Sequence, residues 1–338
     1  MAEFESKMQA WIKDEQCEVG RILTRLLFDI QGKCLEEARN DVNSFRERVR
    51  NALCKMHEAH GVLALGQGVQ KITYQDPFYQ LGYLYKLSML SGRSLSKVIY
   101  YSRAMENRTM QTSITVVCLG GGPGSDVLGV LDYFVKCMAH FQGQLNIQLY
   151  DRRDKWAACW GSLKTAINAE LYDGRISVSF HDFDVTTDDK NKPNLQNADI
   201  ITMHYFMEEV YSERNEPNVV ECFDYILQTA KPGALFLYSG MFMYGAIDWV
   251  HQLFNNCELL TPGTEPPHRW YQNHRTTLTE WIPCIEVNLN HERDLQLFDD
   301  IKGDLERFYD PKEVAQRCHG KVIYRLYRKV NNHSHWYW

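Results

Sequence analysis

Apolar residues in the first third of the chain recur at helical spacing. Two stripes fit one face of a helix each, with positions three and four apart: Ile22, Leu23, Leu26, Leu27 and Ile30, then Phe45, Val49 and Leu53. Two further helical patterns follow Asp76 and Ser94, residue types that commonly begin helices. We predict that residues 1–110 form a helical region.

After Thr112 the pattern changes to short apolar or β-branched runs that alternate with helical stretches. This alternation is typical of a doubly wound α/β sheet. The five predicted strands are residues 114–120, 146–151, 176–182, 198–205 and 234–240, and the helices between them are near 124–140, 154–170 and 216–230. A helix near 245–256 and strands within 276–289 and 321–330 complete about seven strands.

Composition and charge narrow the class of protein. The 338 residues are 44% hydrophobic, with a formal net charge of -6, so the chain as a whole is not attracted to a phosphate backbone. The N-terminus has no signal-peptide pattern, and no apolar run approaches the ~20 residues of a membrane span. The ten cysteines show no zinc spacing. We expect a reduced protein of the cytoplasm or nucleus, without a metal or a membrane anchor; no pattern specifies an oligomeric state.

A glycine-rich turn is the strongest local signal. The predicted strand 114–120 runs directly into Gly120, Gly121, Gly122, Pro123 and Gly124, and a helix follows. Glycine backbone can turn this tightly and approach a ligand closely. A strand-to-helix turn without a ligand is the alternative, although the strand-turn-helix context favours a ligand.

Acidic residues end the next two predicted strands. Asp151 ends the second strand, where nucleotide-binding α/β folds place a carboxylate on ribose hydroxyls. Asp182 and Phe183 end the third, and they offer a carboxylate for an amino group and a ring for the face of a base.

In this order, the glycine turn, Asp151, Asp182 with Phe183, and the Lys231-Pro232-Gly233 turn resemble the motifs of class I S-adenosylmethionine-dependent methyltransferases. The resemblance implies a Rossmann-like, seven-stranded, mostly parallel sheet over residues 111–338, with S-adenosylmethionine as the cofactor. It implies that Gly120, Gly122 and Gly124 hold the methionine part, Asp151 the ribose, and Asp182 with Phe183 the adenine. We further expect Gly121, Asp126, Arg152 and His204 to bind the cofactor, and residues 1–110 to cap the cleft and shape the acceptor site.

The sequence departs from this family at Cys118, where many members have an acidic residue. We expect Asp126 to substitute through water. A nicotinamide-dependent oxidoreductase fits less well, because Val127 occupies the position of the third glycine in the dinucleotide fingerprint. An acidic first helical turn also disfavours a pyrophosphate.

Candidate catalytic residues follow the fourth predicted strand, at the sheet edge where open α/β folds bind ligands. These are His204, Tyr205 and Glu208, with Glu209 beside them. Histidine can remove a proton near neutral pH, although a core histidine and a solvated Glu pair are equally compatible with the pattern. Methyl transfer needs alignment above all, so a base is optional.

Two acceptor classes remain: a small metabolite, which the acidic chain slightly favours, and RNA, for which the segment 263–275 with Trp270 and Tyr271 is the candidate contact. We expect an N or O acceptor atom, with C as a further option. A catalytically idle domain that binds S-adenosylmethionine as a sensor or scaffold is the third hypothesis.

Overall fold

The computed structural model describes residues 18–64, 74–108, 110–138, 140–171, 173–187, 192–261, 284–288 and 319–330. The predicted contact segment 263–275 lies outside these residues. Among the described helices, none is long and apolar enough to cross a membrane.

Helices dominate the N-terminal region, as predicted. They are α2 (Glu18–Glu37), α3 (Val42–Ala64), α4 (Pro77–Tyr83), the π-helical turn η1 (Leu84–Ser88), α5 (Met89–Ser102) and the short η2 (Glu106–Arg108). Asp76 caps α4 by accepting the Phe78 N–H at 3.0 Å. Ser94 does not begin a helix: it lies inside α5, and its hydroxyl donates to the carbonyl of Leu90.

The remaining elements build an α/β sheet. Its strands are β1 (Ser113–Leu119), β2 (Gln144–Asp151), β3 (Ile176–Asp182), β4 (Ile200–His204), β5 (Leu235–Gly240), β6 (Cys257–Leu259), β7 (Cys284–Asn288) and β8 (His319–Lys329). Their order is β3-β2-β1-β4-β5-β8-β6, and β7 also pairs with β8. Strands β1 to β5 are parallel, whereas β8 is antiparallel to its partners. The sequence pattern missed β6, because three residues are too few to show a periodicity.

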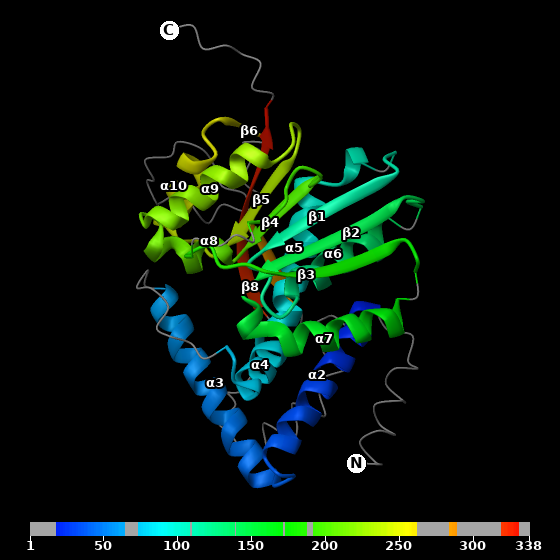
Figure 1. Cartoon of the computed structure of the whole chain (residues 1–338), viewed down its shortest axis with the longest axis vertical. Helices are drawn as coiled ribbons and strands as arrows, with labels where there is room; N and C mark the ends of the chain where they lie inside the picture. Colours follow the sequence, from blue (N-terminus) through cyan, green and yellow to red (C-terminus); the bar gives the residue numbers. More distant parts are fainter. Residues whose placement is uncertain are drawn as a thin grey trace, which may run out of the picture.

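Helices cover both faces of the sheet (Figure 1). One face packs against α5, α6 (Ser125–Cys137) and α7 (Arg153–Glu170); the other packs against α8 (Phe206–Val210), α9 (Pro217–Thr229) and α10 (Tyr244–Leu253). Strand β1 alternates between these cores, since Val116 and Cys118 belong to the first and Val117 and Leu119 to the second. Helix α2 packs along α7 and so attaches the N-terminal region to the first face.

The strand order reverses between β1 and β4, because β2 and β3 lie on one side of β1 while β4 and β5 lie on the other. In open α/β sheets, ligands bind at the carboxyl ends of the strands beside such a switch point. We therefore expect a ligand site at the turns that follow β1, β2, β3 and β4.

Candidate functional site

The glycine turn after β1 needs glycine at two positions. Gly120 and Gly124 have φ values of 69° and 113°, in the left-handed region that other residues rarely adopt. A Cβ on Gly120 would lie 2.1 Å from the Phe206 ring, and a Cβ on Gly124 would lie 2.1 Å from a Leu163 methyl group. Side chains pack directly on the bare backbone, which explains why a larger residue would not fit.

Asp151, at the end of β2, fixes the centre of this turn. One carboxylate oxygen accepts the Gly122 N–H at 2.7 Å, and the other accepts the Arg152 N–H at 2.6 Å. Burial raises the pKa of Asp151 to about 6, while the two backbone N–H groups oppose the shift. The carboxylate is thus held in place beside the turn and is ionised at neutral pH.

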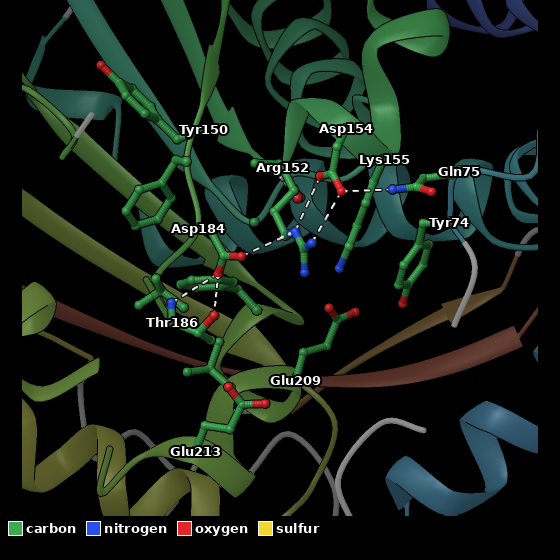
Figure 2. Close-up of a pocket in the computed structure, with 16 residues that line it drawn as sticks. Tyr74, Gln75, Tyr150, Arg152, Asp154, Lys155, Asp184, Thr186, Glu209 and Glu213 are labelled. Atoms are coloured by element: carbon green, nitrogen blue, oxygen red, sulfur yellow. Dashed lines mark hydrogen bonds and ion pairs between the residues drawn. The ribbon is translucent and has the colours of Figure 1, made fainter. Parts of the chain in front are cut away.

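A cavity of about 490 Å³ opens beside Asp151, within the range usual for small-molecule sites (Figure 2). The turns after β1, β2 and β3, helix α8, and the start of the α4 segment all contribute to it. Its lining residues are Tyr74, Gln75, Gly120, Tyr150, Asp151, Arg152, Asp154, Lys155, Phe183, Asp184, Val185, Thr186, Phe206, Glu209, Val210 and Glu213.

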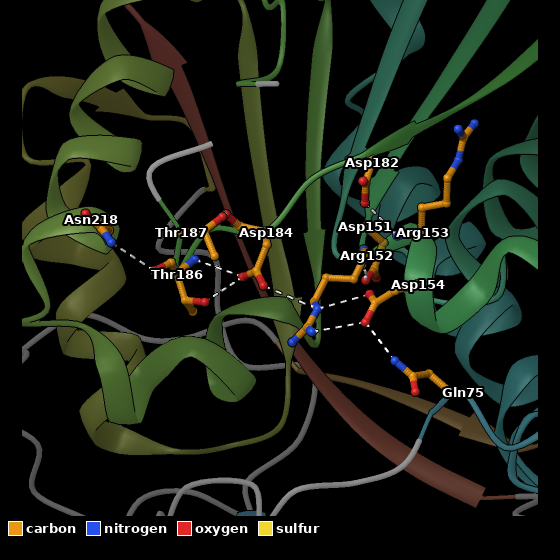
Figure 3. A network of polar contacts seen from close by, with 10 residues as sticks. All are labelled: Gln75, Asp151, Arg152, Arg153, Asp154, Asp182, Asp184, Thr186, Thr187 and Asn218. Carbon is orange, nitrogen blue, oxygen red and sulfur yellow. Dashed lines mark hydrogen bonds and ion pairs between the residues drawn. The ribbon is translucent and has the colours of Figure 1, made fainter. Parts of the chain in front are cut away.

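Acidic groups outnumber basic ones in this lining, with five carboxylates against Arg152 and Lys155. Arg152 forms ion pairs of 3.2 Å with Asp154 and with Asp184, and Gln75 donates to Asp154 (Figure 3). Asp184 also accepts the backbone N–H and the hydroxyl of Thr186. The cavity is therefore suited to a cationic ligand.

Glu209 and Glu213 are lining carboxylates whose side chains form no hydrogen bond or ion pair with another described residue. The Glu209 side chain is open to solvent, yet it projects into the cavity toward Tyr74 and Lys155 (Figure 2). Loss of hydration within the cavity raises the pKa of Glu209 to about 8; the Asp151 and Glu208 carboxylates add to the shift and Lys155 opposes it. A carboxyl group with such a pKa can gain or lose a proton near neutral pH.

The structure brings only part of the predicted set together. Gly120, Asp151, Arg152 and Phe183 line the cavity, while Gly121, Gly122 and Gly124 complete the turn beside it. Asp182 lies elsewhere: it is exposed, and its carboxylate accepts the Arg153 N–H at the start of α7.

Asp126 is almost fully buried below the turn and does not line the cavity. It accepts a hydrogen bond from the Thr202 hydroxyl, and burial raises its pKa well above the usual range. The geometry does not match the expected approach to a ligand through water.

The three predicted catalytic residues also lie outside the cavity lining. Both ring nitrogens of His204 contact buried partners, the Ser239 hydroxyl at 2.7 Å and the Ser91 carbonyl at 3.1 Å. Burial lowers the pKa of His204 to about 3, so the ring is neutral and structural. This geometry argues against the expected role as a base.

Tyr205 and Glu208 hold the backbone and core around β4. Tyr205 begins α8 with a left-handed φ of 59°, and its N–H donates to the Ser239 carbonyl. Glu208 is buried, and its carboxylate accepts the Tyr238 hydroxyl at 2.9 Å. Burial raises the pKa of Glu208 to about 7.

Several lining residues carry little signal in the sequence. Asp184 lies two residues after Asp182 in the same acidic segment, and it lines the cavity whereas Asp182 does not. Tyr74 and Gln75 lie in a stretch without periodicity, far from the sheet in sequence. Within the described residues, no group of three or more His, Cys, Asp or Glu side chains could hold a metal ion.

Part of the chain matches a known protein family. A family model described as "Putative SAM-dependent methyltransferase" matches residues 76–239, from the cap of α4 to β5. Over these residues the chain is similar to S-adenosylmethionine-dependent methyltransferases. The match indicates a methyltransferase with S-adenosylmethionine as its cofactor. No curated protein sequence matches this methyltransferase.

Solved structures of similar layout have low sequence identity to this methyltransferase. One, a putative class I S-adenosylmethionine-dependent methyltransferase from Listeria monocytogenes, shows 9% identity, a TM-score of 0.42, and coverage of 94% of this chain and 90% of its own. A SAM-dependent methyltransferase from Methanosarcina mazei shows 9% identity, a TM-score of 0.37, and coverage of 67% and 98%. The N-methyltransferase NodS from Bradyrhizobium japonicum shows 9% identity, a TM-score of 0.33, and coverage of 70% and 97%.

Proposed function

We propose that this methyltransferase transfers the methyl group to a nitrogen or oxygen atom of a small metabolite, and that the reaction takes place in the cavity beside Asp151. The observation that carries the proposal is the acidic lining, in which five carboxylates face two basic side chains. S-adenosylmethionine is a sulfonium cation without phosphate, so these charges favour it. They disfavour the phosphates of an RNA acceptor at the reacting end.

We infer the positions of the cofactor groups from the residues that line the cavity. The Asp151 carboxylate receives the ribose hydroxyl groups, and the turn beside Gly120 holds the methionine part. Phe183 packs on the adenine, and Asp184 replaces Asp182 as the carboxylate for its amino group, because Asp184 lines the cavity whereas Asp182 is exposed. We retain Arg152 as the residue that orients Asp184 through their 3.2 Å ion pair.

The N-terminal region supplies one wall of the site and acts as its cap. Tyr74 and Gln75 line the cavity. The buried Gln80 side chain donates to the carbonyls of both Tyr74 and Lys155, which ties this region to α7 at the cavity. An acceptor bound here would contact the cap and the sheet together.

Isothermal titration with S-adenosylmethionine, S-adenosylhomocysteine and NAD tests the cofactor assignment. We expect micromolar binding of the first two and no binding of NAD. A screen with tritium-labelled cofactor then compares a small-metabolite extract with total RNA as the acceptor. Label in the RNA alone would contradict the metabolite proposal, and binding without transfer to either would favour the sensor hypothesis.

A further inference from the structure

Glu209 lies on the cavity side that the cofactor's sulfur would occupy. Phe206 packs against Gly120, and Glu209 follows it three residues later, so both side chains lie on the same face of α8. In the proposed binding mode the sulfur links the ribose at Asp151 to the methionine part at the glycine turn. Glu209 and Asp151 line the same cavity, and the Asp151 carboxylate contributes to the raised pKa of Glu209.

The neighbours of Glu209 leave its carboxylate available. Tyr74 and Lys155 project toward the same part of the cavity from the cap and from α7 (Figure 2). Lys155 lies over the Tyr74 ring, 5.0 Å from its centroid. The titratable and charged groups that influence Glu209, or are influenced by it, are Asp151, Lys155, Glu208, Tyr74, Tyr79 and Tyr83.

We propose that Glu209 is the ionised partner of the cofactor sulfonium and the group that takes up the acceptor's proton once the sulfonium charge has disappeared. This inference rests on the proposed function of the cavity. It gives Glu209, not Glu208 or His204, the role of proton acceptor.

In this proposal Glu209 loses a proton when the cofactor binds and takes one up after methyl transfer. Without cofactor, Glu209 has a pKa of about 8 and is mostly protonated at neutral pH. A sulfonium nearby favours the carboxylate, so binding of S-adenosylmethionine releases the proton. During transfer, the acceptor lone pair bonds to the methyl carbon, and the carbon–sulfur bond breaks with its electron pair left on sulfur. The product thioether is neutral, so the Glu209 carboxylate can then take the proton from the acceptor N–H or O–H.

Proton linkage measured by calorimetry tests this without an identified acceptor. The enthalpy of binding is measured at pH 7.5 in phosphate and in Tris, for S-adenosylmethionine and for S-adenosylhomocysteine. In the wild type, we expect S-adenosylmethionine to release up to about 0.8 proton more than S-adenosylhomocysteine, as ionisation of one carboxyl with a pKa of about 8 would give. In Glu209→Gln, this difference should vanish.

Glu213→Gln is the matched control, because it removes a second lining carboxylate one helical turn away. It should keep the difference between the two ligands. Retained binding of S-adenosylhomocysteine by Glu209→Gln shows that the variant is folded. Equal proton release by both ligands in the wild type, or an unchanged difference in Glu209→Gln, would overturn the role of Glu209 while leaving the cofactor assignment intact. Binding of neither ligand would overturn the proposed function and this inference with it.

Discussion

The indole N–H of Trp160 donates a hydrogen bond to the carbonyl oxygen of Gly122 at 2.9 Å. Trp160 is buried in α7, so this bond connects the helix after β2 with the turn after β1. Together with the bond from the Gly122 N–H to Asp151, it fixes both sides of one glycine. The shape of the cofactor turn therefore depends on Trp160, which does not itself line the cavity.

Trp160→Phe should weaken cofactor binding by removing that donor. The expected loss is about 1 kcal/mol, roughly fivefold in the dissociation constant for S-adenosylhomocysteine. Trp156→Phe is the control, because Trp156 contacts the Tyr74 and Tyr83 rings and its change leaves the Gly122 bond intact. Calorimetric titration of both variants measures the effect. Equal weakening in the two would show that ring volume, not the hydrogen bond, positions the turn.

Cofactor affinity should depend on pH through Asp151. Its pKa is about 6 in the cofactor-free protein, and the protonated carboxyl is a poorer acceptor for ribose hydroxyl groups. We expect S-adenosylhomocysteine to bind about tenfold more weakly at pH 5 than at pH 7. Asp151→Asn should bind ~1 to 3 kcal/mol more weakly at pH 7 and lose most of this pH dependence.

Unfolding caused by protonation of Asp151 would not explain weaker binding at pH 5. The folded-state pKa of Asp151 lies above its ordinary value of 3.8. Protonation therefore favours the folded state, and the contribution of Asp151 to stability increases as the pH falls from about 6 toward 4. A pH-independent affinity in the wild type would contradict the assignment of Asp151 to the ribose.

His204 should stay neutral across the physiological range. Its pKa is lowered to about 3 by burial, so its ring resonances in a nitrogen-proton correlation spectrum should not shift between pH 5.5 and 8. An unfolded chain protonates this histidine below its ordinary value of 6.5, so its contribution to stability decreases as the pH falls through that value. A midpoint near 6.5 in the folded protein would restore it as a candidate base.

Asp199 should be essential for stability but not for binding. It precedes β4 and accepts hydrogen bonds from Arg108 and Lys231, each at 2.7 Å, and from the Thr115 N–H at 2.8 Å. Asp199→Asn leaves the partly buried Arg108 without its counter-charge, which should cost about 3 kcal/mol of unfolding free energy in urea. The affinity for S-adenosylhomocysteine should remain within twofold; a large loss would mean that this end of the sheet is coupled to the cavity.

The sequence by itself determined the framework of the site. Periodicity predicted the helical N-terminal region and the five parallel strands, because these elements bury one stripe or run of apolar residues each. The glycine turn and Asp151 were also readable, since a tight turn after a strand allows few residue types and the carboxyl ends of parallel strands meet at one edge. The strands and their order confirm the predicted sheet, while the binding roles of the glycine turn and Asp151 stay predictions.

Only the tertiary structure decided which neighbouring side chains face the cavity. Asp182 and Asp184 are two residues apart, yet one caps α7 and the other lines the site, because the direction of the chain after β3 depends on packing against α8 and α9 rather than on local pattern. Glu208 and Glu209 are adjacent in α8, but they point in different directions. Glu208 accepts a hydrogen bond from Tyr238, whereas Glu209 lines the cavity. Tyr74 also lines the cavity, but it comes from the N-terminal region. The sequence did not indicate this position, because contacts between segments distant in sequence leave no periodic signal in either segment.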